Sequence, residues 1–205
     1  MPTSVALLTA TTVGWLFCCV LILAFGRRIN HIYPATALLA GGISMLIAAT
    51  FGWQMNDTWD APAPIYLAVV GLTSHIDALA SIFIALLAVI VIAVAFFSPG
   101  YLSYLDKKTH PGCYWIELFL FVIGMLGVIL AANAISFLIF WELFTLSSIL
   151  LIATDLSSHQ AGKAAFIYLG ATKIATCFLM AGFLWMYSIF HSWSFSDWSF
   201  GASST

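Results

Sequence analysis

Six long stretches of this sequence are almost free of charge, and each is long enough to cross a lipid bilayer as a helix. The first, Val5 to Phe25, would span about 31 Å at 1.5 Å per residue, against a hydrocarbon core of about 30 Å. Because 63% of the 205 residues are hydrophobic and only 7% are charged, they cannot cover a water-soluble surface. The sequence therefore predicts an all-α polytopic membrane protein with about six transmembrane helices.

We expect one membrane domain, 1–205, with helices at about 5–25, 34–53, 77–97, 114–132, 135–153 and 164–190. The first helix lacks the basic start of a cleavable signal, so we expect it to be retained. Gln54–Pro64 predicts an exposed loop, and Ile65–His75 predicts a short extended or hairpin segment. Asp77 is typical of a helix cap, and the run Ser98–Gly100 predicts the end of the third helix.

The positions of the cations predict the orientation in the membrane. Five of the six Lys and Arg residues fall in alternate loops between the predicted helices: Arg27, Arg28, Lys107, Lys108 and Lys163. Short loops rich in Lys and Arg stay on the cytoplasmic side of a membrane. We therefore expect a multi-pass protein of the inner, cytoplasmic membrane of a bacterium, with both termini on the outer side.

Two charged residues lie deep inside the predicted helices, whereas Glu117 enters the fourth helix only three residues from its start and is interpreted as interfacial. Glu142 lies in the fifth helix and Lys173 in the sixth, at depths that differ by about one helical turn near the centre of the bilayer. Charged groups at such depth usually face a bundle interior or a hydrated cavity and pair with each other. Thr145 lies one turn from Glu142 and Thr176 one turn from Lys173, so hydroxyl groups accompany both charges.

Two interpretations of this pair remain open. Glu142 and Lys173 could form a static ion pair that fixes the packing of two helices. Alternatively, Glu142 could carry a proton along a path that includes Thr145 and Thr176, with Lys173 setting how readily the carboxylate is protonated.

Other functional classes find little support in the sequence. The formal net charge of -2 offers no basic patch for nucleic acid. The four cysteines form no CxxC pair, and the histidines fall in loops or at helix ends, so we expect no metal site, no disulfide and no cofactor. Composition therefore indicates the lipid bilayer as the expected partner.

Three segments resemble a known family. They are His75-Ile-Asp-Ala-Leu-Ala-Ser-Ile-Phe, then Asn133-Ala-Ile-Ser-Phe-Leu-Ile-Phe-Trp-Glu142-Leu-Phe-Thr-Leu-Ser-Ser-Ile-Leu-Leu, and Ala161-Gly-Lys-Ala-Ala-Phe-Ile-Tyr-Leu-Gly-Ala-Thr-Lys173. Together they are similar to the antiporter-like subunits of respiratory complex I and the Mrp antiporters. Within that superfamily the sequence most resembles the N-terminal part of the large membrane subunit of formate hydrogenlyase and of the related fourth type of hydrogenase. The resemblance covers about Thr73 to Tyr187.

The resemblance implies that Glu142 corresponds to the helix-five glutamate of the proton path, and that Lys173 occupies a position where related subunits carry a polar or basic residue. It further implies a proton-translocating or cation/proton antiporter-like subunit of a respiratory, NADH dehydrogenase-like or hydrogenase-type oxidoreductase complex. Such a subunit is not catalytic by itself and works with membrane and peripheral subunits. Family members continue through some fourteen helices, so we expect this chain to need further helices. The alternative is a structural membrane anchor, or an inactive truncated remnant, that scaffolds partner subunits.

Overall fold

The computed structural model describes residues 3–25, 30–55, 59–62, 73–104, 111–153 and 159–198. Within these ranges, six helices are long and apolar enough to cross a membrane, which confirms the predicted all-α polytopic fold. The elements in chain order are α1 (Thr3–Phe25), α2 (Ile32–Met55), β1 (Trp59–Pro62), β2 (Thr73–Ile76), α4 (Ala78–Tyr104), α5 (Pro111–Leu130), α6 (Ala134–Ala153), α7 (His159–Phe190) and the short 3-10 helix η1 (Phe195–Asp197).

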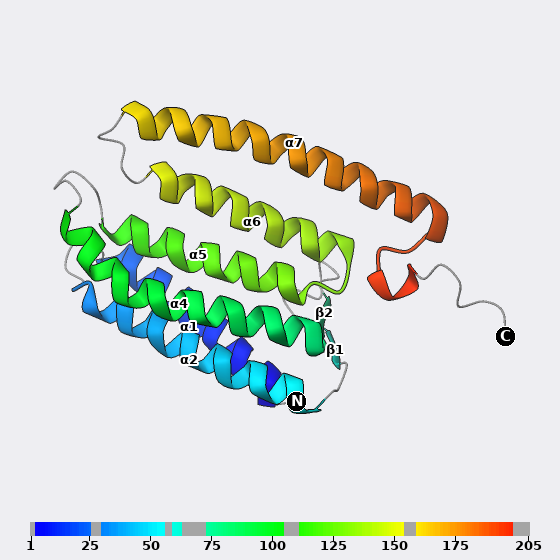
Figure 1. Cartoon of the computed structure of the whole chain (residues 1–205), viewed down its shortest axis with the longest axis horizontal. Coiled ribbons are helices and arrows are strands. Elements are labelled where there is room, and N and C mark those ends of the chain that lie inside the picture. The colour runs from blue at the N-terminus through cyan, green and yellow to red at the C-terminus, as the bar shows by residue number, and fades with distance from the viewer. Residues whose placement is uncertain are drawn as a thin grey trace.

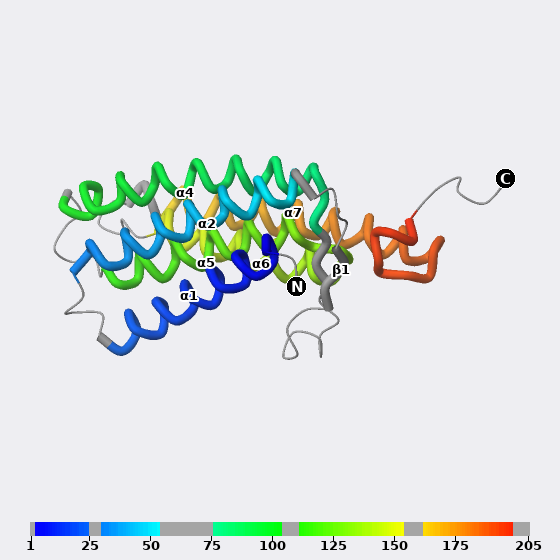
Figure 2. The backbone as a smooth tube through the Cα atoms, turned by 90° about the horizontal axis from the view of Figure 1, so that it is seen from below, coloured from blue at the N-terminus to red at the C-terminus, as the bar shows by residue number. Residues whose placement is uncertain are grey.

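The helices form a compact group with two more helices added on one side (Figure 1). Helices α1, α2, α4 and α5 pack together, α6 packs on α5, and α7 packs on α6. Viewed from below, α1 lies at one side of the bundle and α4 at the opposite side (Figure 2). The largest fully buried side chains include Trp15 of α1 and Trp115 and Phe119 of α5, so the apolar core lies in the four-helix group.

Helix α7 is the outermost helix of the bundle. In its membrane-spanning part only 6% of the positions are buried, compared with 44% in α5. Phe166, Phe178 and Trp185 each expose at least 70% of their surface. Burial of apolar side chains within the described part of the chain therefore stabilises α7 only slightly. Its position is determined by its contacts with α6.

The helices alternate in direction across the bundle. Helices α1, α4 and α6 end, and helices α2, α5 and α7 begin, at the same end of the bundle (Figure 1). Lys163 lies exposed in the first turns of α7 at that end. Arg27, Arg28, Lys107 and Lys108 lie outside the described residues. That this end faces the cytoplasm remains a prediction.

Helix α4 does not end at the predicted breaker. It continues through Pro99 to Tyr104, so the predicted end at Ser98–Gly100 is wrong. The fully buried Ser98 hydroxyl donates to the carbonyl of Val94 at 2.7 Å and lies 2.9 Å from the hydroxyl of Tyr114 on α5. Proline is tolerated in transmembrane helices where neighbouring groups satisfy the freed backbone polar groups.

The start of α4 follows the sequence more closely. The Asp77 side chain accepts a hydrogen bond from the backbone N–H of Ala80 at 2.6 Å, which confirms the predicted cap. Strand β2 pairs antiparallel with β1, so part of the predicted hairpin is present, although residues 63–72 lie outside the described ranges. Strand β1 occupies part of the segment that predicted an exposed loop, because backbone pairing with β2 satisfies its polar groups. Helix α5 begins at Pro111 and α7 at His159, both earlier than predicted.

Two glycines allow α5 and α6 to approach closely. A Cβ atom added at Gly124 would lie 2.7 Å from the backbone nitrogen of Phe144, and one at Gly127 would lie 2.2 Å from the ring of Phe140. Small residues in transmembrane helices permit such close contact, and this contact positions the helix that carries Glu142.

We expect Gly124→Ala to destabilise the protein by about 1–3 kcal/mol, because the added methyl group meets the backbone of α6 rather than a flexible side chain. Thermal unfolding of the purified protein in detergent would measure the loss as a lower midpoint temperature. Gly170→Ala is the matched control, since nothing lies within 4 Å of the new methyl group on exposed α7. A midpoint that falls equally in both variants would contradict the close packing of α5 on α6.

Candidate functional site

Glu142 and Lys173 form an ion pair between α6 and α7. The Lys173 Nζ donates a hydrogen bond to Oε2 of Glu142. The two helices are antiparallel neighbours (Figure 1). Glu142 and Lys173 each lie near the middle of their helix, in line with the depth in the bilayer that the sequence predicts. The Lys173 side chain is 40% exposed and the Glu142 side chain 34% exposed. The two predicted charges therefore meet, at the edge of the described bundle rather than in its core.

A second contact between the same helices lies beside the ion pair. The indole N–H of Trp141 donates to the hydroxyl of Thr176 at 3.1 Å, and that hydroxyl donates to the carbonyl of Thr172 at 3.0 Å. Thr176 is thus held one turn from Lys173, as the sequence predicts, but its polar contact is with Trp141 rather than with the charges. The Trp141 ring also stacks on Phe137, with ring centroids 5.9 Å apart.

Thr145 lies three residues after Glu142 on α6, about one helical turn from the ion pair. Its side chain is almost completely buried, and its hydroxyl donates to the backbone carbonyl of Glu142 at 3.1 Å. It does not use the Glu142 carboxylate as its acceptor in this arrangement. The Thr145 hydroxyl therefore lies in the helical turn that follows Glu142, and its hydrogen bond is to the backbone rather than to the charged group.

A third contact joins α6 and α7 nearer to the end of the bundle where Lys163 lies. The Ser148 hydroxyl lies 2.9 Å from the Tyr168 hydroxyl, and 2.7 Å from the carbonyl of Thr145 on its own helix. Trp141 and Ser148 are seven residues apart on α6, which places them on one helical face. The three contacts of Trp141, Glu142 and Ser148 line the α6–α7 interface with polar groups.

Sequence reasoning missed Trp141, Ser148 and Tyr168 as members of this interface. The spacing offered a signal: Trp141, Thr145 and Ser148 follow an i, i+4, i+7 pattern, and Tyr168, Thr172 and Thr176 follow i, i+4, i+8. Polar residues at helical spacing in an apolar segment indicate a face that meets other polar groups.

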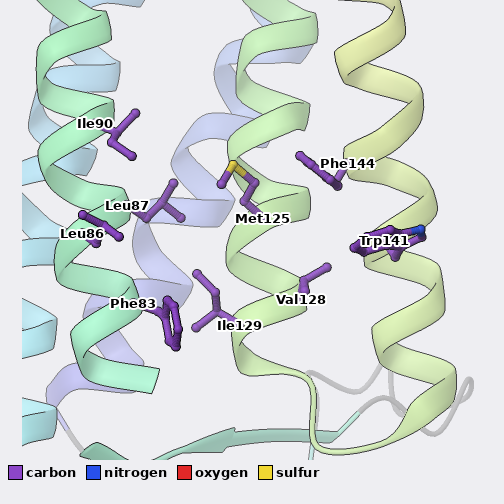
Figure 3. A pocket seen from close by; sticks show the side chains of 9 residues that line it. All are labelled: Phe83, Leu86, Leu87, Ile90, Met125, Val128, Ile129, Trp141 and Phe144. Carbon is purple, nitrogen blue, oxygen red and sulfur yellow. The ribbon is translucent and has the colours of Figure 1, made fainter. Parts of the chain in front are cut away.

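An apolar groove lies on the other side of Trp141. It has a volume of about 210 Å³ and runs between α4 and α6 over α5. Figure 3 shows the side chains that line it: Phe83, Leu86, Leu87, Ile90, Met125, Val128, Ile129, Trp141 and Phe144. The ring of Trp141 therefore forms part of an apolar wall, while its N–H reaches Thr176. Water has no polar partner in this groove, so the groove gives no wet route to the ion pair.

Within the described ranges, no group of three or more His, Cys, Asp or Glu side chains is arranged to hold a metal ion. Cys18, Cys19, Cys113 and Cys177 are all free thiols. The described α6–α7 interface thus brings together a carboxylate, an ammonium, an indole N–H and several hydroxyl groups.

The sequence pattern of the family described as "NADH:quinone oxidoreductase/Mrp antiporter, TM" matches residues 131–202, which contain the ion pair. A protein of Staphylococcus haemolyticus named as an antiporter subunit, mnhA2, is 32% identical over 120 residues, or 58% of this chain and 15% of its own length. The mnhA2 protein of a Staphylococcus aureus strain is 33% identical over 113 residues, 55% of this chain and 14% of its own length.

The fold agrees with these sequence matches. A chain of the membrane-bound sulfane sulfur reductase, an archaeal respiratory membrane complex, superposes with a TM-score of 0.76 at 17% identity, over 98% of this chain and 40% of its own length. Over the matched residues the chain is similar to antiporter-like membrane subunits of the complex I and Mrp type. It matches only about one seventh of the length of the curated relatives, and it spans two fifths of the solved chain.

We expect the ion pair to stabilise the packing of α7 on α6 by at least about 1 kcal/mol, since removal of one partner leaves a charge without its counterion in an apolar region. A double-mutant cycle of Glu142→Gln, Lys173→Met and both together, followed by unfolding in detergent, would measure this coupling. Strictly additive losses in the double variant would mean that the two charges do not stabilise each other.

Proposed function

We propose that this protein is the proton-translocating part, or the cation/proton antiporter-like part, of a membrane-bound respiratory or hydrogenase-type oxidoreductase complex. The single observation that carries the proposal is the contact of Glu142 with Lys173 in the middle of two membrane-spanning helices. The family match over residues 131–202 supports the same function.

The ion pair has the chemistry of a switchable proton carrier. The Glu142 carboxylate can bind and release a proton, and the Lys173 ammonium that contacts it can move away and return. Movement of Lys173 towards and away from Glu142 therefore loads and unloads one proton, and the hydroxyls of Thr145 and Thr176 flank the two positions.

The exposed edge of the site supports the need for further helices. About a third of each charged side chain is open at the outer edge of the α6–α7 pair. Charged groups at the centre of a bilayer are not left against acyl chains. Large apolar side chains also cover the open face of α7, and the matched relatives are several times longer than this chain. We infer that additional membrane-spanning helices, from the same or another polypeptide, cover this edge in the working complex.

The expected location follows from the same argument. The end of the bundle that bears Lys163 and the predicted cationic loops would face the cytoplasm of a bacterium, with the complex in the inner membrane. Reduction or oxidation would then take place in other subunits of the complex.

We expect Glu142→Gln to abolish proton movement, because an amide cannot release a proton as a carboxylic acid does. The measurement is proton flux across inverted membrane vesicles that contain the assembled complex, compared with vesicles that lack the protein. Lys163→Gln is the control for altered charge, since Lys163 is exposed at the end of α7. Unchanged flux in Glu142→Gln would disprove the proposed role.

A structural anchor is the second candidate, and one observation favours it: polar contacts run along the α6–α7 interface and could simply hold α7 in place. The double variant Glu142→Leu/Lys173→Leu separates the two functions. Two apolar residues restore packing where an ion pair is lost. We expect assembly of the complex to survive in this variant while proton flux is lost. Survival of both assembly and flux would favour the anchor.

A further inference from the structure

Trp141 precedes Glu142 on α6, and its ring and its N–H group have different neighbours. The ring stacks on Phe137, with ring centroids 5.9 Å apart, and meets Phe144 edge-on at the same centroid distance. The indole N–H donates to the Thr176 hydroxyl of α7 at 3.1 Å. In Figure 3 the ring nitrogen lies at the end of the ring that is turned away from the apolar groove. Packing on α6 therefore fixes the ring, and the fixed ring presents its N–H to α7.

The Thr176 hydroxyl is the matching group on α7. It accepts the hydrogen of the Trp141 N–H and donates its own hydrogen to the carbonyl of Thr172 at 3.0 Å. A hydroxyl has a single hydrogen to donate, so the bond to Thr172 fixes how the Thr176 oxygen faces Trp141. Both partners of the contact between Trp141 and Thr176 are thus held in orientation by their own helices.

This contact and the ion pair share one register of α7 on α6. Trp141 and Glu142 are consecutive residues, and Thr176 follows Lys173 by three residues, so Thr176 and Lys173 lie on one face of α7. A helix rotates as a unit. Any rotation or slide of α7 that separates Thr176 from Trp141 therefore also carries Lys173 away from Glu142.

The proposed proton cycle makes a second, uncharged contact necessary. In that cycle Lys173 leaves Glu142 and must return to it. Only 6% of the positions in the α7 span are buried, and apolar contacts between helices in lipid gain little over contacts with acyl chains. An indole N–H without an acceptor is costly in an apolar region, so Trp141 keeps its bond while the ion pair is open. This contact is nearer to the ion pair, along both helices, than the contact of Ser148 with Tyr168.

We propose that Trp141 is a positioning residue for the proton carrier. Its hydrogen bond to Thr176 keeps α7 in register while the ion pair is open, so that the Lys173 ammonium returns to Glu142. This inference rests on the proposed proton-translocating function. Trp141 binds no proton in the cycle, because an indole N–H is a donor only. It acts through Lys173, and the bond to Thr176 is the means.

Proton flux in two variants and in their combination tests this role. Trp141→Phe removes the N–H and keeps an aromatic ring, and Thr176→Val removes the hydroxyl and keeps the branched shape. We expect each to lower the flux about fivefold at equal amounts of assembled complex, the factor by which loss of one interhelical hydrogen bond in a membrane shifts an equilibrium. The combined variant is expected to conduct no less than the weaker single variant, because both changes remove the same bond. Losses that multiply in the combined variant would overturn the proposal.

Thr176→Ser separates positioning from simple packing. Serine keeps the hydroxyl that accepts the Trp141 N–H but lacks the methyl group of threonine. We therefore expect Thr176→Ser to retain most of the flux that Thr176→Val loses. Flux as low in Thr176→Ser as in Thr176→Val would mean that the side chain acts by its shape, and the positioning role would be wrong.

Trp185→Phe is the matched control for the loss of an indole group, since Trp185 is 70% exposed on the same helix α7. We expect full flux in this variant. Full flux also in Trp141→Phe and Thr176→Val, with none in Glu142→Gln, would remove the positioning role and leave the proposed function intact. Full flux in Glu142→Gln would remove both.

Discussion

The ion pair of Glu142 with Lys173 is the interaction that sets the position of α7 relative to the rest of the protein. Only 6% of the positions in the α7 span are buried, so apolar packing alone gives this helix little preference for one rotation or depth. In lipid, moreover, apolar contacts between helices gain little over contacts with acyl chains. A buried charge without its partner is far more costly. The ion pair therefore fixes one register of α7 on α6, and the contacts on either side of it follow from that register.

Much of the fold could be predicted from charge and hydropathy, because the bilayer imposes lengths and depths directly. The six spans and the alternation of their ends follow from that constraint. So does the contact of Glu142 with Lys173, since two opposite charges at one depth in consecutive helices have few other partners. The predictions that failed concern interactions between distant residues. Pro99 signals a helix end in isolation, yet α4 continues to Tyr104, and next to Pro99 the Ser98 hydroxyl contacts Tyr114 of α5.

The side chains around the ion pair were harder to predict, because helical spacing gives the face of a residue but not the neighbour that the face meets. Thr145 and Thr176 were expected near the charges, and each is near them, yet one bonds to a backbone carbonyl and the other to Trp141. The segment after α7 shows the same limit. His191 adopts a positive φ of 51°, and the chain then returns to the turn between α5 and α6, where the Ala134 N–H donates to the Trp193 carbonyl at 3.0 Å. No local pattern in the sequence indicated this return.

The ion pair of Glu142 with Lys173 lies at the edge of the described helices. A Lys and a Glu side chain that are 40% and 34% exposed would be well hydrated at a protein surface in water, where their attraction would be weak. At the centre of a bilayer the same exposure is tolerable only against water or other polar groups. Whatever covers this edge therefore also determines how strongly the two charges attract each other, and hence how easily Lys173 leaves Glu142. Coverage by further helices would make the ion pair tighter, while a water-filled space would loosen it. The proton carrier that we propose needs both conditions in turn, so control of its cycle would lie in the covering layer, with the proposed proton-binding group in α6.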